Sequence, residues 1–203
     1  MKKIVLNGLT NGNIDGSDSY QYMKFENITI DDIINVEFNN CLFSHVEFQS
    51  SELSKLSFYN CIIESSDFSN ANLSESSFVN VEVKDTKLVG SDLSNSYLKD
   101  VNIHDSNLSY SLFYETNFKN VEFVNNKMVN VSINGVRINK LSFDNNDLSK
   151  SEFMNLNLKG VNFSNSNISG ITTDLKSLEG IIVSNIQALE LSKLLKIRIE
   201  GEE

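Results

Sequence analysis

A large apolar residue recurs at every fifth position through most of this sequence. From Ile33 to Ile168, every residue whose number ends in 3 or 8 is large and apolar, 28 residues in succession. Twelve of the 13 phenylalanines belong to this series. Neither the 3.6-residue period of a helix nor the two-residue alternation of a strand produces such a pattern. The chain is therefore predicted to be built from five-residue units.

A second inward position is predicted two residues before each large one. It is small or aliphatic in all units but three, the exceptions being Asp31, Asn126 and Asn146. Two residues after the large one, asparagine and glycine are common, and both tolerate the left-handed backbone of tight turns. Each unit thus supplies a short extended segment, a turn and two inward side chains. A single unit cannot bury them, so the units must wrap into coils and stack.

The spacing of the phenylalanines indicates four units per coil. Two groups are separated by steps of twenty residues: Phe38, Phe58 and Phe78, and Phe123, Phe143 and Phe163. A coil of twenty residues places such residues above one another, about 4.8 Å apart. The 28 units then make seven coils. Met23 and Ile28 keep the same spacing, so we expect them to continue the large inward series in an irregular coil at the N-terminal end.

Several units match a known motif. Ala71-Asn72-Leu73-Ser74, Ser91-Asp92-Leu93-Ser94 and Val161-Asn162-Phe163-Ser164 each read small residue, Asp or Asn, Leu or Phe, polar residue. Over residues 31–170 the chain resembles the pentapeptide-repeat proteins. The resemblance implies an all-β fold, a right-handed quadrilateral β-helix of about seven to eight coils with a short C-terminal α-helix. The expected domains are an N-terminal cap or loop at 1–22, the β-helix at 23–182, and a C-terminal helix and tail at 183–203.

The five-residue register fades after Ile168, and a helical pattern follows at 184–196. Ser184 with Gln187 fits a capping box. The open end of a β-solenoid exposes unpaired backbone, so a terminal helix would cover it. The helix is either a lid on a monomer or a dimerisation element. It resembles the C-terminal helix through which Qnr-type and mycobacterial-type quinolone-resistance proteins dimerise, which implies a homodimer. The predicted interface residues are Ile186, Leu189, Leu191, Leu194 and Leu195.

The charge of the chain is acidic and unevenly distributed. It holds 17 Lys and Arg against 27 Asp and Glu, a net charge of -10 at pH 7, which favours basic partners over nucleic acid. Residues 31–100 hold 12 acids and 4 bases, whereas residues 101–170 hold 6 of each. A coil of twenty residues sorts most acids onto two opposite faces, the first acidic face over Ile33, Leu53 and Leu73 and the second acidic face over Phe43, Ile63 and Val83.

The residues predicted to bind a partner are acids on these two faces. They are Asp32, Glu52, Glu75, Asp92 and Glu115 on the first acidic face, and Glu64, Glu82, Asp85 and Asp105 on the second. One intervening face, over Phe38, Phe58 and Phe78, is basic instead. It carries Glu37 and Asp100 against Lys99, Lys119, Arg137, Lys140 and Lys159.

Two functions are compatible with this surface. Qnr-type proteins are thought to imitate duplex DNA, and the resemblance implies a non-enzymatic DNA mimic that binds DNA gyrase or topoisomerase IV and confers quinolone protection. The alternative is a pentapeptide-repeat scaffold for another, basic protein partner. Residues 31–170 lack the projecting loops of Gram-negative Qnr-type proteins, and a C-terminal dimer would place the neutral half of the rod at its centre. Both features favour the alternative.

The sequence carries no catalytic, cofactor or metal-binding motif. It has no Ser-His-Asp grouping and no Gly-rich phosphate loop, so we expect a protein that is not an enzyme and holds no cofactor. His45 and His104 fall on outward positions three coils apart. Cys41 and Cys61 fall on stacked small positions, where buried thiols are expected although a disulfide is geometrically conceivable. Because no apolar run is long enough for a signal or a membrane helix, we expect a cytoplasmic protein without direct membrane or nucleic-acid binding.

Overall fold

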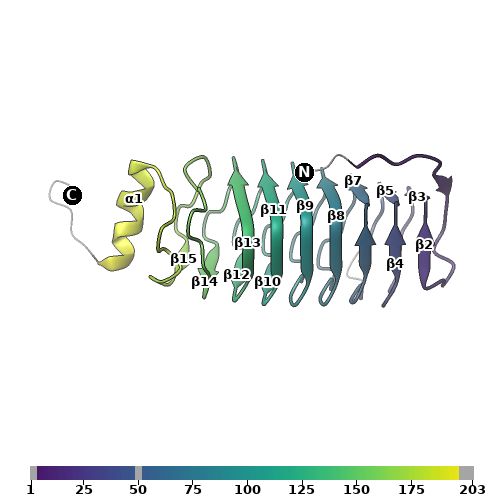
Figure 1. The fold of residues 1–203 in the computed structure, drawn as a ribbon, viewed down its shortest axis with the longest axis horizontal. Helices are drawn as coiled ribbons and strands as arrows, with labels where there is room; N and C mark the ends of the chain where they lie inside the picture. The colour runs from purple at the N-terminus through teal and green to yellow at the C-terminus, as the bar shows by residue number, and fades with distance from the viewer. Residues whose placement is uncertain (1–3, 49–51, 197–203) are drawn as a thin grey trace.

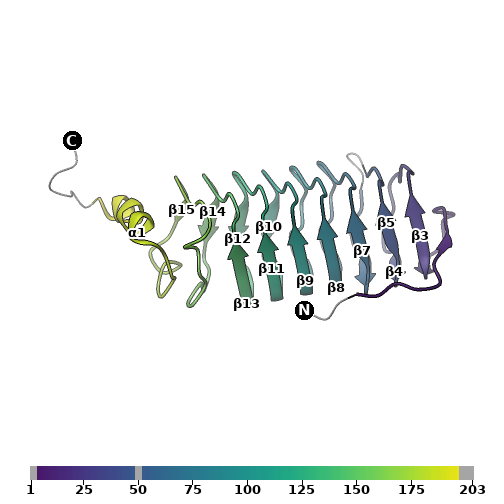
Figure 2. The same cartoon turned by 90° about the horizontal axis from the view of Figure 1, so that it is seen from above.

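The computed structural model describes residues 4–48 and 52–196. In it the chain winds into a parallel β-solenoid of about eight coils, and one short helix covers the C-terminal end (Figure 1). Figure 2 shows the successive strands lying side by side along the rod. Part of the expected C-terminal domain, residues 197–203, lies outside the described residues.

Two parallel sheets run along the rod within the described residues. The larger sheet contains β1 Thr10–Asn11, β2 Ser19–Gln21, β3 Met23–Glu26, β4 Glu37–Asn39, β5 Leu42–Ser44, β6 Ser57–Tyr59, β7 Ile62–Glu64, β8 Ser77–Lys84, β9 Tyr97–His104, β11 Asn117–Val124 and β13 Arg137–Asp144. The smaller sheet contains β10 Leu112–Tyr114, β12 Ser132–Asn134, β14 Glu152–Met154 and β15 Thr172–Thr173. The helix α1 spans Asn185–Ser192, and a 3₁₀ helix, η1, follows at Lys193–Leu195.

Residues twenty apart stack from one coil to the next. Phe38 pairs with Phe58, and Phe58 pairs with Phe78. Their rings stack at centroid distances of 5.3 and 4.9 Å. The second group of phenylalanines stacks in the same way, at 5.4 and 5.3 Å. The predicted coil of four five-residue units is confirmed.

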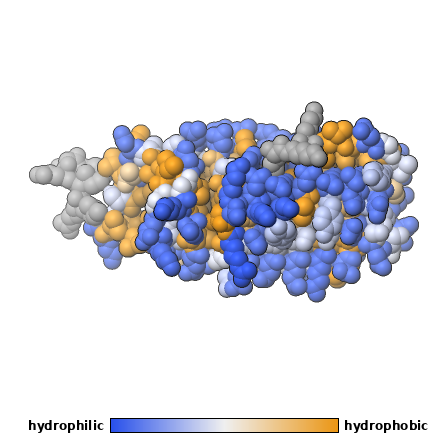
Figure 3. All heavy atoms as spheres, in the orientation of Figure 1, coloured by the Kyte–Doolittle hydropathy of each residue, from blue (hydrophilic) through white to orange (hydrophobic). Residues whose placement is uncertain are grey.

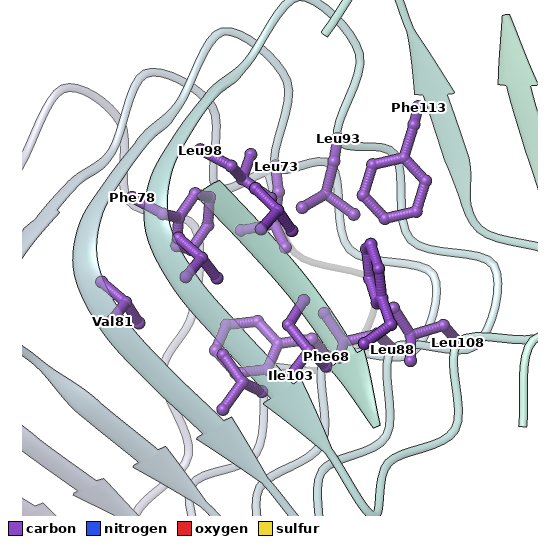
Figure 4. Close-up of a cluster of buried hydrophobic side chains, with 14 of the residues drawn as sticks. Phe68, Leu73, Phe78, Val81, Leu88, Leu93, Leu98, Ile103, Leu108 and Phe113 are labelled. Atoms are coloured by element: carbon purple, nitrogen blue, oxygen red, sulfur yellow. The ribbon is translucent and has the colours of Figure 1, made fainter. Parts of the chain in front are cut away.

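The large inward series forms one continuous core along the rod. All 28 of its residues are buried except Ile33 and Ile138, which are half-buried. Figure 4 shows Phe68, Leu88 and Leu108, from three successive coils, pointing into this interior. Burial of apolar surface contributes roughly 25 cal/mol per Å², so a filled interior of this kind is the main stabilising term of the solenoid.

The first coil departs from the expected register. Phe25 takes the large inward position and pairs with Phe43, eighteen residues later instead of twenty. Met23 and Ile28 lie two residues before a large inward residue, in the smaller position. The prediction that Met23 and Ile28 continue the large series is therefore wrong. Because β2 already pairs with β4, the paired part of the chain also begins ahead of the expected boundary at residue 23.

The cause of this shift is one shortened unit. Ile30 and Ile33 both belong to the inward series, yet they are three residues apart instead of five. Asp31, which the five-residue pattern places inside, is exposed. A carboxylate without a partner is costly to bury, so the chain gives up two residues of the unit and keeps this charge in water.

The smaller inward position supplies hydrogen bonds as well as a close fit. Ser66 Oγ accepts a hydrogen bond from the N–H of Val46, one coil earlier, at 3.1 Å. In the same column, Asn146 Oδ1 accepts hydrogen bonds from the N–H and from Nδ2 of Asn126 at 2.9 and 3.1 Å. The predicted asparagine ladder is confirmed. These side chains satisfy corner N–H groups that are buried, as buried polar groups require.

The C-terminal helix docks on the solenoid through two polar side chains, Gln187 and Glu190, and Glu190 Oε1 accepts from the Gly170 N–H at 3.0 Å. Gln187 Oε1 accepts from the Ser184 N–H at 2.8 Å and Ser184 Oγ accepts from the Gln187 N–H at 3.3 Å, so the predicted capping box is present. Gln187 Nε2 donates to the carbonyls of Phe163 and Ser166 at 2.9 and 2.7 Å. The ladder asparagines make the same kind of bond to carbonyls 23 residues earlier. Gln187 thus acts as the last member of the polar column.

Candidate functional site

The acids predicted to bind a partner all lie on the outside of the solenoid. The exposed ones are Asp32, Glu75, Asp85, Asp105 and Glu115, and the half-buried ones are Glu52, Glu64, Glu82 and Asp92. The coil of twenty residues brings together those that are separated by a multiple of twenty residues, such as Asp32, Glu52 and Asp92. It separates the two acidic faces, which lie on opposite sides of the core.

The first acidic face carries a row of polar side chains along the rod axis. Asn72 pairs with Glu52 on one side and with Asp92 on the other. Asp32 Oδ1 accepts from the Glu52 N–H at 2.7 Å, and Asn72 Nδ2 donates to both Glu52 carboxylate oxygens at 2.8 Å. Hydrogen bonds from Ser54 and Asn72 hold the pKa of Glu52 below its usual value. Glu52 therefore stays ionised at neutral pH, and the acids of this row form no ion pair within the described residues.

More of the carboxylates on the second acidic face are paired with basic side chains. Lys84 Nζ lies 2.8 Å from a Glu64 carboxylate oxygen. His104 lies between two acids, with Nε2 3.2 Å from Glu82 Oε1 and Nδ1 2.8 Å from Asp105 Oδ2. The hydrogen bond from His104 lowers the pKa of Asp105. Because these carboxylates already have partners, the first acidic face is the better candidate for a contact with a basic protein.

An exposed aromatic and apolar strip interrupts the first acidic face. Leu112 continues the row of Asp92, with which it pairs, and is 43% exposed. Tyr110 and Tyr114, on either side of it along the chain, are 59% and 51% exposed. Sequence reasoning missed this strip. The signal was present, since the five-residue register already assigns these three residues to outward positions.

The C-terminal end carries a second uncovered apolar surface. Of the predicted interface residues, Ile186, Leu189, Leu194 and Leu195 are exposed, and Leu191 is half-buried against the core. Ile186 is the most exposed of them, at 79%. Apolar residues gather at this end of the molecule in Figure 3. Gln187 is the only buried residue of α1, so the helix leaves most of its apolar side chains facing water.

The side chains that could bind a metal or act as nucleophiles do not cluster within the described residues. Within residues 4–48 and 52–196, no group of three or more His, Cys, Asp or Glu side chains could hold a metal ion. Cys41 and Cys61 are free thiols and are buried. Their Sγ atoms donate to backbone carbonyls at 3.4–3.5 Å.

No helix in the described part of the chain has the length and apolar character needed to cross a membrane.

Comparison with known proteins agrees with the repeat architecture. A family model described as a pentapeptide repeat region matches residues 31–108. Residues 31–108 are a pentapeptide repeat region. Beyond this pentapeptide repeat region, pairs with the same twenty-residue offset occur as far as Asn162 and Ile182. A search among curated proteins gave no match.

Solved structures that resemble the chain include a fluoroquinolone resistance protein and a pentapeptide-repeat protein. Full-length QnrB1, a plasmid-mediated fluoroquinolone resistance protein, is 17% identical with a TM-score of 0.33, covering 88% of this chain and 100% of that chain. HetL, involved in heterocyst differentiation regulation in the cyanobacterium Nostoc sp. strain PCC 7120, is 15% identical with a TM-score of 0.35, covering 82% and 90%. At these identities, function has to be argued from this chain's own surface.

Proposed function

We propose that this protein binds type II topoisomerase, either DNA gyrase or topoisomerase IV, as a non-enzymatic acidic rod that imitates DNA and protects the enzyme from quinolones. The observation that carries the proposal is the row formed by Asp32, Glu52 and Asp92. Its carboxylates are held at fixed heights along the solenoid and form no ion pair in the part of the chain that the structure describes. The resemblance of the C-terminal helix to that of Qnr-type proteins supports the same partner.

The physical basis is a match of charge along an axis. Duplex DNA carries one negative charge per about 1.7 Å of helix axis. Residues 31–100, with 12 acids against 4 bases, form the part of the rod that approaches such a density. A surface that binds DNA would therefore attract this half by long-range electrostatics, and the association would weaken as salt is raised.

A gyrase supercoiling assay with and without ciprofloxacin tests the proposal. The protein should restore supercoiling in the presence of the drug, and Asp92→Lys should raise the concentration needed for protection at least about tenfold. Glu47→Lys is the matched control, because Glu47 is exposed on a face outside both acidic faces and undergoes the same change of charge. If the protein neither binds gyrase or topoisomerase IV nor alters supercoiling, the proposal is wrong. A scaffold for another basic protein would then be the function to pursue.

We also propose that two copies associate through the C-terminal end. The exposed side chains of Ile186 and Leu189 on α1 and of Leu195 on η1 give this end an apolar surface, and a second copy of the same surface would cover it. Homo-oligomers with a two-fold axis use one patch on both subunits in this way.

If two copies associate in this way, a single substitution at the contact should lower the average molecular mass in solution. Leu189→Glu should raise the dimer dissociation constant at least about tenfold, as measured by sedimentation equilibrium, because it places a charge in the apolar contact. Asn185→Glu should leave the constant within about twofold, since a carboxylate is well accommodated in the first turn of a helix. A wild-type protein that sediments as a monomer at high micromolar concentration would contradict the proposal.

A further inference from the structure

A cleft opens between β13 and the segment one coil later, residues 155–161. In earlier coils the N–H of Asn40 donates to the Tyr59 carbonyl at 2.9 Å, and the N–H of Asn60 donates to the Val79 carbonyl at 3.0 Å. The equivalent bond from Lys140 to residue 159 is absent from the described structure. Within the described residues β13 pairs only with β11. The edge of β13 that faces the following coil is therefore open.

The local turn changes where the ladder stops. The long strands β8, β9, β11 and β13 each pass this corner at one residue with a positive φ, which in β13 is Lys140 at 65°. One coil later, the N–H of Val161 donates to the Leu158 carbonyl at 2.9 Å and closes a tight turn. The amides of Asn155 and Leu156 point to the following coil, as their counterparts in other coils do, and donate to Asp174 Oδ2 at 2.7 Å and Ser177 Oγ at 3.0 Å. The turn that Val161 closes is not joined to Lys140 by a backbone hydrogen bond, so the ladder is interrupted at this corner.

Burial and shape agree with an open edge. Ile138 is half-buried, whereas Phe118, its partner in β11, is fully buried. A hollow of about 650 Å³ lies between β13, the segment after β14 and residues 174–179, and a second of about 380 Å³ adjoins it around Lys140 and Gly160. On the next face, Phe143 and Phe163 remain stacked at 5.3 Å, so the cleft is confined to the basic face.

The cleft is cationic on a molecule that is acidic as a whole. Four cations line it, none with an ion pair in the described part of the chain: Arg137, Lys140, Lys159 and Lys176. Of the two lining acids, Glu179 is exposed, and Asp174 is occupied by hydrogen bonds. Bonds from Ser177 and Asn155 lower the pKa of Asp174 to about 2. The cleft therefore has an excess of positive charge, which an acidic ligand would neutralise.

We propose that this cleft binds an extended acidic segment of another protein, which adds as a strand to the open edge of β13. The N–H of Arg137 donates back to the Thr116 carbonyl at 3.0 Å, so the alternating amides of Ile138 and Lys140 face the cleft. An open edge offers donors and acceptors in alternation, which an extended peptide satisfies along its length. The four cations select acidic side chains on that peptide. The site lies on a different face from the acidic row and does not depend on topoisomerase binding.

Hydrogen exchange on the full-length protein tests the open edge and its ligand together. Without ligand, the amides of Ile138 and Lys140 should exchange at least about a hundredfold faster than those of Phe118 and Asn120 in β11. A blocked peptide of alternating glutamate and valine should slow their exchange, and one of alternating lysine and valine should not. Equal protection of the two pairs of amides without ligand would mean that the edge is closed and would overturn the proposal.

Substitutions separate the cleft from general charge effects. Lys159→Glu should weaken binding of the acidic peptide at least about tenfold, whereas Lys127→Glu, exposed outside the cleft, should change it less than about twofold. Equal losses in the two variants would overturn the proposal. So would binding of the acidic peptide no tighter than the basic one, or the same protection by inorganic phosphate, which would indicate a general anion site.

Discussion

Phe143→Ala is expected to lower the free energy of unfolding by about 3–5 kcal/mol. The Phe143 ring lies in the middle of a stack, 5.4 Å from Phe123 and 5.3 Å from Phe163, and it meets Phe153 edge-on at 6.1 Å. The backbone ladder between β11 and β13 fixes the spacing of these two coils, so the wall on that side cannot collapse into the space that the ring leaves. The cost should therefore include the cavity as well as the lost burial.

Urea denaturation followed by circular dichroism measures this loss. Leu112→Ala is the matched control, because Leu112 sits on the same kind of coil but is 43% exposed, and it should change stability by less than about 1 kcal/mol. A Phe143→Ala loss no larger than that of Leu112→Ala would show that the core is loosely packed and would contradict the stacking described above.

Asn146→Val is expected to cost about 2–5 kcal/mol, although valine is common elsewhere at the smaller inward position. The substitution leaves the N–H of Asn126 and the carbonyl of Phe123 without the bonds that Asn146 provides at 2.9 and 2.8 Å. Each buried group that loses its partner costs about 1–3 kcal/mol. The loss should thus come from hydrogen bonding and not from volume.

Asn146→Ser distinguishes a loss of hydrogen bonding from a loss of side-chain volume. Serine at this column accepts the N–H of the preceding coil, as Ser66 does from Val46 and Ser166 does from Asn146. Asn146→Ser should therefore lose roughly half as much stability as Asn146→Val when both are measured by the same urea denaturation. If serine costs as much as valine, the polar column does not contribute through these bonds.

The two charged surfaces lie in different parts of the molecule. The acidic row lies in the N-terminal half on the first acidic face, whereas the basic cleft lies in the C-terminal half on the basic face. A rod that binds a basic protein along one part and an acidic segment at the other could hold two partners at a fixed separation, because the solenoid between them is continuously paired from β4 to β13.

The sequence by itself determined the repeating architecture. One large side chain in every five, with twenty-residue spacing of the phenylalanines, allows a single solution in which all of them are buried. For that reason the coil, its core and the asparagine ladder could be predicted, whereas the capping box at Ser184 was predicted from the local motif that Ser184 forms with Gln187. The outward position of each predicted acid followed from the same register.

Only the tertiary structure decided where the repeat breaks and what the breaks expose. The pattern treats all units alike, so it could not show that Phe25 enters the core through a unit shortened to three residues, or that the corner at Val161 no longer matches the one before it. Nor could it show that α1 is held by Gln187 and leaves Ile186 in water. Each outcome depends on a contact between segments about twenty residues apart, and a periodic sequence carries no local signal for a contact of that kind.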